Sequence, residues 1–339
     1  MSLGQGLQTT DDGRLPCLGS VLYWMILFGA VAVLLLVGCQ VKADASPASF
    51  YPEPATVSPA SVSTSSPTPT VTLALLGDVM LGRGINPSTE TFAYLEPFLN
   101  SADLTLANLE SPLSHASVQT ASSYALCAPP ECADLLTEAG FNLLTLANNH
   151  ILDCGKQGVL DTQSALTEVG LGFVGPDPEP AYREIKGVRL AFLALDATGT
   201  FDLDGAEQAV RSAKEAGAFV IVSIHWGAEY QAGESQFQKE IADQLAGAGA
   251  ALIWGHHPHV LQPAAWINEG RTLVFYSLGN ALFDQYGLAD TRRSVLVQVS
   301  LDPKGVVDYR AIPFVIDVPN SRIIAADAES VQAILRYFR

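Results

Sequence analysis

Half of the histidines in this chain lie in one short stretch. The segment IWGHHPHVLQP contains His256, His257 and His259, and the whole chain of 339 residues has 6 histidines. If this segment is extended, the rings of His257 and His259 point to the same side, and Pro258 between them stiffens that conformation. Crowded imidazoles repel one another when protonated, so neutral rings that bind a cation are the natural use of this pattern. The segment therefore predicts a metal site.

Other apolar runs also end in side chains that can bind a metal ion. Carboxylate, amide or imidazole groups follow these runs at Asp78, Asn108, Glu110, Asn148, Asn149, His150, His225 and Asn280. Asp and Asn after a strand also begin turns or cap helices, but turn chemistry does not explain why the whole set stands at successive run ends. In open α/β sheets, ligands bind in the crevice at the carboxyl ends of the strands. We therefore expect these side chains to meet in one site.

The residue types indicate the chemistry of that site. Carboxylate oxygen, amide oxygen and imidazole nitrogen suit Mn, Fe or Zn. Two divalent cations held close together polarise a phosphoryl or acyl oxygen and lower the pKa of a shared water. Glu110 can bridge two such ions, and His150 is expected to donate the leaving-group proton. The sequence thus predicts a hydrolytic site with two metal ions.

The elements that must position these residues alternate in type. Six apolar runs predict strands at 71–78, 102–110, 141–150, 218–227, 250–259 and 272–280. Amphipathic stretches between them predict helices at 158–169, 206–216 and 236–248. Towards the C-terminus we expect two antiparallel strands joined at 302–305, and a short helix with Asp327 as its N-cap. This alternation is typical of an α/β fold.

The N-terminal part has a different composition. Residues 21–38 form an uncharged apolar segment at the lower length limit for crossing a bilayer. Leu36-Val37-Gly38-Cys39 looks like a bacterial lipobox, whose cysteine is lipidated after cleavage; the alternative is an uncleaved signal anchor. Residues 40–70 are rich in Pro, Ser and Thr and predict an extended linker. In both cases we expect the domain at 71–339 to lie outside the cytoplasmic membrane and to be tethered to it.

The charge balance excludes one class of partner. The chain has 18 basic and 35 acidic residues and a net charge of -17. Such a surface repels nucleic acid, so we expect no nucleic-acid partner.

The cysteines allow two interpretations. Cys127 and Cys132 flank a Pro-Pro turn in CAPPEC, where they form either a small-loop disulfide or two free thiols. Cys154 is then left unpaired, and no second cysteine pair exists to complete a zinc-thiolate site.

Six motifs in order resemble the CapA family. They are LALLGDVMLGR, LANLESPLS, LANNHILDCGKQGVLDT, SIHWGAEY, GHHPHVLQP and YSLGN, and the resemblance runs from 72 to 315. This bacterial family is linked to the synthesis and export of poly-gamma-glutamate capsules and belongs to the calcineurin-like metallophosphoesterase superfamily. The resemblance implies a four-layer α/β sandwich of the metallo-dependent phosphatase type, with two packed sheets.

The resemblance also implies roles for individual residues. Asp78 and His259 would bind a first metal ion, and Glu110 would bridge to a second ion. His150 would be the catalytic acid. Ligands of the second ion would be Asn149, His225 and His257. Residues expected to support these ligands are Asn148, Glu229, His256 and Asn280.

The chain departs from the superfamily pattern at two positions. The usual Asp-x-His of the first strand is replaced by Asp78-Val79-Met80, and Glu110 stands where an aspartate is usual. Both changes reshape a two-metal site.

Two charged residues near the motifs have alternative roles. Arg83 either holds an anionic substrate group or is a solvated loop residue. Glu229 either orients His225 or caps the following helix.

These observations lead to two functional hypotheses. The first is a metal-dependent hydrolase outside the membrane that acts on an anionic polymer such as poly-gamma-glutamate. The second is a non-catalytic envelope component that binds polymer for a membrane synthase, which Met80 favours.

Overall fold

The computed structural model describes residues 70–118, 124–177 and 179–339. The apolar segment 21–38, the lipidation candidate Cys39 and the expected linker up to residue 69 lie outside these residues. No helix in the described ranges is long and apolar enough to cross a bilayer.

The first sheet of the described chain combines parallel and antiparallel strands. Its strands are β1 (Val71–Val79), β2 (Leu104–Leu109), β3 (Leu143–Thr145), β4 (Gly172–Val174), β11 (Asn280–Leu282), β12 (Arg293–Asp302), β13 (Gly305–Asp317) and β14 (Arg322–Ala325). The order is β14-β13-β12-β1-β2-β3-β4, and β11 pairs with β1. Strands β1 to β4 are parallel, while β12, β13 and β14 are antiparallel. We call this the eight-stranded sheet.

The second sheet holds the strands that precede most of the histidines. Its strands are β5 (Ala181–Ile185), β6 (Val188–Asp196), β7 (Phe219–His225), β8 (Ala250–His256), β9 (Leu261–Ile267) and β10 (Thr272–Leu278). The order is β5-β6-β7-β8-β10-β9, with β6, β7, β8 and β10 parallel. We call this the six-stranded sheet.

The two sheets pack face to face over a shared apolar core. Leu73 and Leu75 of β1 lie in this core with Phe192 of β6 and Phe275 of β10. Leu76, the next residue of β1, lies in the core on the other face of its sheet, because successive side chains of a strand alternate.

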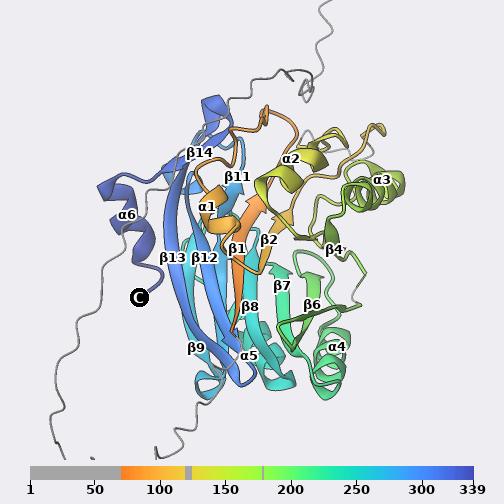
Figure 1. Cartoon of the computed structure of the whole chain (residues 1–339), viewed down its shortest axis with the longest axis vertical. Helices are drawn as coiled ribbons and strands as arrows, with labels where there is room; N and C mark the ends of the chain where they lie inside the picture. The colour runs from red at the N-terminus through yellow and green to blue at the C-terminus, as the bar shows by residue number, and fades with distance from the viewer. Residues whose placement is uncertain (1–69, 119–123, 178) are drawn as a thin grey trace, which may run out of the picture. The chain divides into compact units, whose positions relative to one another are not determined.

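Helices cover the outer faces of both sheets (Figure 1). These helices are α1 (Glu96–Leu99), α2 (Cys132–Ala139), α3 (Gly155–Glu168), α4 (Leu203–Glu215) and α5 (Gln236–Ala248), whereas α6 (Ala328–Leu335) contributes Ile334 to the core shared by the two sheets. Leu99, Leu136 and Leu166 bury α1, α2 and α3 against the eight-stranded sheet. Val210 and Leu245 bury α4 and α5 against the six-stranded sheet. The resulting order of helix, sheet, sheet and helix confirms the predicted four-layer α/β sandwich.

The predicted elements are present. Each of the six apolar runs contains a strand, and α3, α4 and α5 overlap the three predicted helices. The antiparallel pair β12 and β13 turns at 303–304, and Asp327 caps α6 by accepting the backbone N–H of Ser330 at 2.7 Å.

A glycine allows the two sheets to approach at the first strand end. A Cβ at Gly77 would lie 1.8 Å from the carbonyl oxygen of Gly279. The Asp78 backbone N–H donates to that same oxygen at 3.0 Å, and Asp78 is in register with Asn280. The absence of a side chain at Gly77 therefore brings Asp78 and Asn280 together.

The disulfide differs from the predicted one. Cys127 pairs with Cys154, with 6.2 Å between their Cα atoms, so the predicted pairing of Cys127 with Cys132 is wrong. Cys132 begins α2 and is fully buried in the core between that helix and its sheet. Its side chain is therefore directed into the apolar core, while Cys154 at the start of α3 is the residue that reaches Cys127.

Candidate metal centre

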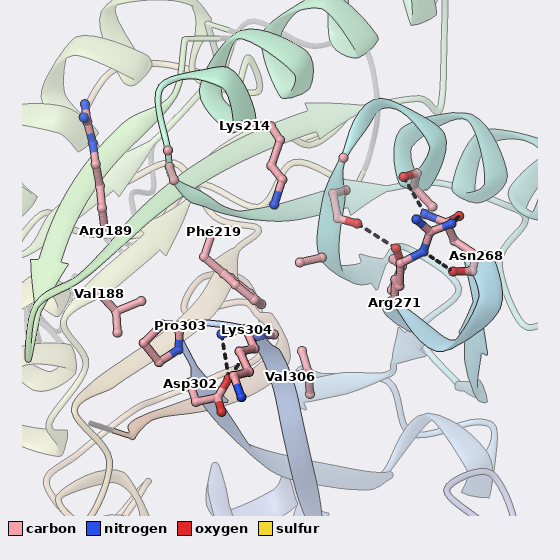
Figure 2. Close-up of a pocket in the computed structure, with 18 of the residues that line it drawn as sticks. Val188, Arg189, Lys214, Phe219, Asn268, Arg271, Asp302, Pro303, Lys304 and Val306 are labelled. Carbon is pink, nitrogen blue, oxygen red and sulfur yellow. Dashed lines mark hydrogen bonds between the residues drawn. The ribbon is translucent and has the colours of Figure 1, made fainter. Parts of the chain in front are cut away.

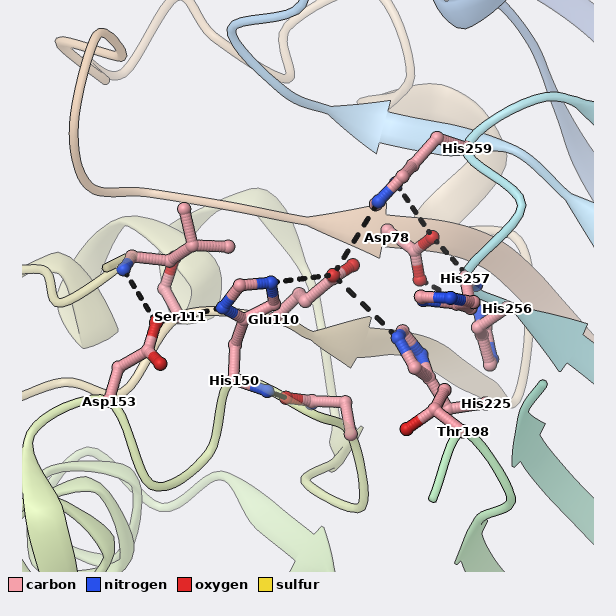
Figure 3. Close-up of polar contacts among 12 residues, drawn as sticks. Asp78, Glu110, Ser111, His150, Asp153, Thr198, His225, His256, His257 and His259 are labelled. Atoms are coloured by element: carbon pink, nitrogen blue, oxygen red, sulfur yellow. Dashed lines mark hydrogen bonds and ion pairs between the residues drawn. The ribbon is translucent and has the colours of Figure 1, made fainter. Parts of the chain in front are cut away.

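The strand ends of both sheets meet in one buried polar cluster (Figure 3). We call it the candidate metal centre, and its members are Asp78, Glu110, His225, His256, His257 and His259. Asp78 lies near the end of β1, and Glu110 directly follows the parallel strand β2. The histidines belong to β7, β8 and the loop after β8. The structure thus brings these six residues together, as the strand-end pattern predicts.

Asp78 is a fully buried carboxylate. Its Oδ1 accepts a hydrogen bond from Asn108 Nδ2 at 2.8 Å, and its Oδ2 accepts the backbone N–H of His257 at 3.2 Å. His256 Nδ1 lies 3.3 Å from Oδ1, and His259 Nδ1 lies 3.5 Å from Oδ2. Burial raises the pKa of Asp78, but the contacts with His256 and His259 outweigh burial and hold the pKa well below its usual value. Asp78 is therefore ionised, which is the form that binds a cation.

Glu110 is buried without a hydrogen-bond partner. Within the described residues, neither carboxylate oxygen accepts a hydrogen bond. Three imidazole nitrogens surround Oε1, with His225 Nε2 at 3.7 Å, His259 Nε2 at 3.8 Å and His150 Nε2 at 3.9 Å. These distances are too long for hydrogen bonds and leave space for an ion between the groups. Burial, followed by the neighbouring charge of Asp78, raises the pKa of Glu110 well above its usual value.

His259 is oriented by an amide behind it. The Asn280 side-chain nitrogen donates to the Thr291 carbonyl oxygen at 2.9 Å and to Gln285 Oε1 at 3.0 Å. Asn280 Oδ1 must then be the acceptor for His259 Nδ1 at 2.9 Å, so Nε2 is the ring nitrogen that faces Glu110 and would bind an ion after losing its proton. Burial lowers the pKa of His259, but Glu110 and Asp78 outweigh burial and raise it to about 9. Asn280 thus contacts a candidate ligand from behind, which is the position that the sequence predicted for it.

His225 and His257 are neutral rings. Burial lowers the pKa of His225 well below its usual value, and burial also lowers the pKa of His257. His225 Nε2 and His257 Nδ1 have no hydrogen-bond partner in the described chain, and the same holds for both ring nitrogens of His256. Neutral imidazole with an unused nitrogen is the form that binds a metal ion.

The loop that holds His257 and His259 is not extended. His257 has φ of 90° and His259 has φ of 57°, both in the left-handed region, so the expected extended conformation is wrong. Their ring centroids nevertheless lie 5.9 Å apart. A tight turn, with the His257 N–H bonded to Asp78, brings the two rings together.

His150 lies beside the centre with a carboxylate on its far side. Its Nδ1 lies 2.8 Å from Asp153 Oδ2, and its Nε2 faces Glu110. Asp153 Oδ2 also accepts the backbone N–H of Leu126 at 2.8 Å. Asp153 therefore fixes the ring of His150 with Nε2 directed at the centre.

The two asparagines before His150 differ in burial. Asn148 is buried, donates to Asn108 Oδ1 at 3.2 Å and to the Leu109 carbonyl oxygen at 2.9 Å, and accepts the His150 N–H at 3.1 Å. Asn148 thus supports the loop of His150, as expected. Asn149 is exposed, and its metal-binding role stays a prediction.

Two further residues bear on the sequence predictions. Arg83 is exposed and forms an ion pair with Asp284, so both of its predicted roles stay open. Glu229 is exposed and groups with His257 and His259, while the following helix α5 is capped by Ser235. The capping role of Glu229 is therefore wrong.

Two acidic residues near the candidate ligands were not predicted from the sequence. Asp196 ends β6 opposite His225 in β7, and its charge partly opposes the lowering of the His257 pKa by burial. Its signal is the apolar run VRLAFLALD, which ends in a carboxylate like the other strands. Asp153 was detectable only as an acid three residues after His150.

The donor set fits a divalent cation. Asp78, Glu110 and His259 each offer one ligand atom, and these atoms lie within 4.8 Å of one another. The second group consists of Glu229, His257 and His259, whose ligand atoms also lie within 4.8 Å of one another. Buried oxygens and nitrogens without hydrogen bonds are costly unless they bind an ion. The cluster can therefore hold a metal ion.

Comparisons with known proteins agree with this picture. Residues 72–285 match the family described as "Bacterial capsule synthesis protein PGA_cap". The chain is 32% identical to the PGA biosynthesis protein CapA of Bacillus subtilis (strain 168) over 292 residues, covering 78% of this chain and 76% of that protein. It is also 32% identical to the capsule biosynthesis protein CapA of Bacillus anthracis, covering 72% and 67%.

A solved structure shows the same fold. A hypothetical protein from Thermus thermophilus superposes with a TM-score of 0.51 at 17% sequence identity, covering 72% of this chain and 98% of that one.

Proposed function

The chain belongs to the bacterial capsule synthesis protein family PGA_cap, and from this premise we propose that it is a metal-dependent hydrolase of the phosphoesterase type. It would act in the biosynthesis or export of poly-gamma-glutamate or another envelope polymer. The observation that carries the proposal is the buried Glu110 carboxylate, which has no hydrogen bond and faces three imidazole nitrogens.

Two divalent ions, of Mn, Fe or Zn, would be held by the candidate metal centre. Asp78 and His259 would hold one ion, and Glu110 would bridge to the other. Ligands of the second ion would be Asn149, His225 and His257. When bound, the ions supply a polarised phosphoryl oxygen and an activated water.

His150 and Arg83 would act on the substrate. Asp153 accepts the Nδ1 proton of His150, which leaves Nε2 as the atom that exchanges a proton with the leaving group. Arg83 would bind an anionic group. Since its guanidinium already pairs with Asp284, a substrate phosphate or carboxylate would compete with that pair.

The proposed location is outside the cytoplasmic membrane. A lipid on Cys39 or an uncleaved anchor at 21–38 would tether the chain there, beside components of a membrane synthase. The disulfide Cys127–Cys154 supports an oxidising compartment. An anionic polymer would be repelled by the net charge of -17, so the metal ions and Arg83 would supply the local positive charge.

A non-catalytic role in polymer binding is the second candidate. Met80, at the position where the superfamily usually has a histidine, is fully buried in the apolar core. This packing favours a centre with fewer ligands. However, His256 Nδ1 lies 3.3 Å from Asp78 and places an imidazole beside the same carboxylate.

The test combines metal analysis with turnover. We expect the purified protein to contain stoichiometric metal and to hydrolyse bis(p-nitrophenyl) phosphate with Mn added. His259→Ala and Glu110→Gln should lose both. His115→Ala, at an exposed histidine paired with Glu131, is the matched control and should keep both. Metal without turnover would support the second candidate, and unchanged metal content in both variants would overturn the metal centre.

A further inference from the structure

A second concave site lies at the opposite end of the six-stranded sheet. It is a partly open pocket with a cavity volume of about 640 Å³, a size that accommodates a small ligand (Figure 2). Strand β7 begins with Phe219 in the pocket wall and ends with His225 in the candidate metal centre. Because β7 has 7 residues, the two sites lie roughly 20 Å apart. We call this second site the basic pocket.

The basic pocket is positively charged in an acidic chain. Of the 18 Lys and Arg residues, four line it, whereas one of the 35 Asp and Glu residues does so. That acid, Asp302, is already engaged, since its Oδ1 accepts the backbone N–H groups of Lys304 at 2.7 Å and Gly305 at 3.1 Å. The basic residues are Arg189, Lys214, Arg271 and Lys304. A chain with a net charge of -17 therefore has a local excess of positive charge here.

The helix ends do not cancel this charge. The C-termini of α4 and α5 point to the basic pocket, and each carries roughly half a negative charge. The Ala216 carbonyl oxygen accepts from Arg189 Nη1 at 3.1 Å, and the Ala246 carbonyl oxygen accepts from Asn268 Nδ2 at 2.9 Å. The two dipoles together amount to about one charge, which is less than the excess from the side chains.

Two lysines are available to a ligand. Arg271 pairs with Glu269 at 3.1 Å, and the Arg189 guanidinium lies over the ring of Tyr182. In contrast, neither Lys214 nor Lys304 has an ion-pair partner in the described part of the chain. Figure 2 shows Lys214 pointing from its helix into the basic pocket.

The floor of the basic pocket is apolar. Val188 is buried, Phe219 and Val306 are half-buried, and Pro303 lies beside them. A site with an apolar floor and convergent cations fits an organic anion better than a bare ion. We propose that the basic pocket is a second binding site, separate from the candidate metal centre, for an organic anion with closely spaced carboxylate or phosphate groups.

The test is a calorimetric titration of the whole metal-loaded protein. One arm uses tri-glutamate as the carboxylate probe, and the other uses propane-1,3-diphosphonate, which has two phosphonate groups and no ester bond to hydrolyse, as the phosphate probe. The double variant Lys214→Gln/Lys304→Gln should bind the active probe at least tenfold more weakly, because two charge-assisted contacts are lost. Lys239→Gln is the matched control, since Lys239 pairs with Glu234 outside the basic pocket.

A second variant tests the site by shape. Gly247 in α5 lines the basic pocket, and a Cβ there would meet no atom within 4 Å, so Gly247→Trp adds bulk at the pocket wall without a clash at Cβ. We expect this variant to lose binding as well, and His225→Ala, which disrupts the candidate metal centre, to retain it. If the lysine variant loses binding of only one probe, the chemical group of that probe is the one that the basic pocket recognises. The proposal is overturned if neither probe binds, if the lysine variant binds like Lys239→Gln, or if His225→Ala alone abolishes binding.

Discussion

The imidazole of His150 and the carboxylate of Asp153 lie 2.8 Å apart, next to but not within the ligand cluster. The same Asp153 oxygen accepts the Leu126 N–H at 2.8 Å, and the neighbouring residues Cys127 and Cys154 are joined by the disulfide. A covalent bond and a hydrogen bond therefore hold the same two segments together. The position of His150 depends on both.

Asp153→Asn is predicted to lower the kcat of phosphodiester hydrolysis about tenfold to a hundredfold, because the orientation of His150 is lost. KM and metal content should change little, since Asp153 is not a ligand. Steady-state kinetics and metal analysis check this. The control is Asp161→Asn, which removes a half-buried acid of α3 that binds Ser114 and Gln157. Equal kcat in the two variants would contradict the positioning role.

Removal of the disulfide is predicted to weaken both stability and turnover. The loop closed by Cys127 and Cys154 spans 27 residues, for which the chain-entropy model gives about 3.5 kcal/mol. Cys127→Ser/Cys154→Ser should lower the free energy of urea unfolding by that order and reduce kcat, while the metal content is retained. Cys132→Ala keeps the disulfide and is the control. A double variant with full activity would show that the hydrogen bond to Leu126 suffices.

The metal-free protein is predicted to lose stability between pH 6.5 and 9. The pKa of His259 rises from 6.5 to about 9 in the fold, so its stabilisation is complete below pH 6.5 and is lost as the pH rises through 9. Because the pKa of Glu110 is raised, its contribution to stability also falls as the pH rises above 4.5. Because the pKa of Asp78 is lowered, Asp78 changes the stability only below pH 3.8. The His259 contribution is on the order of 3 kcal/mol.

Thermal unfolding of chelator-treated protein at these two pH values checks this sign. His259→Gln should remove most of the dependence. A melting temperature that rises with pH would contradict the assignment of the charged ring.

Asn280→Ala is predicted to lower metal affinity about tenfold to a hundredfold, since His259 Nδ1 loses the acceptor that fixes its tautomer. Competition with a metal indicator measures the affinity. Asn320→Ala, at an exposed asparagine bonded to Asp317, should bind metal like the wild type. Unchanged affinity in Asn280→Ala would mean that Asp78 alone orients the ring.

Gly77→Ala is predicted to prevent stable folding, because the added methyl group would lie 1.8 Å from a backbone oxygen. Expression and circular dichroism check this. Gly170→Ala is the control, since a Cβ there meets no atom within 4 Å, although its φ of 79° makes this variant mildly strained. A well-folded Gly77→Ala protein would show that β1 can move away from Gly279.

The sequence predicted that these strand ends would meet, because strand length and polar strand ends are local features. Asp78, Glu110 and His225 each follow an apolar run, and parallel strands bring such ends to one edge. The position of His150 beside Glu110 was likewise foreseeable from its place after a run.

Features that depend on packing between distant segments were not predictable in this way. The partner of Cys127 is decided by α2, which directs Cys132 into the core, and not by spacing along the chain. The left-handed residues His257 and His259 are held by contacts with Asp78 and Asn280 from the other sheet. A local pattern could suggest only the extended conformation.

The ligands of the candidate metal centre are divided between the two sheets, with Asp78 and Glu110 on one and His225 and His259 on the other. A nascent polypeptide that has been synthesised only as far as β6 possesses both carboxylates and none of these imidazoles. The proposed ion would consequently be captured late in maturation, after the two sheets have packed together. It would be an ion that is present in the compartment where folding finishes.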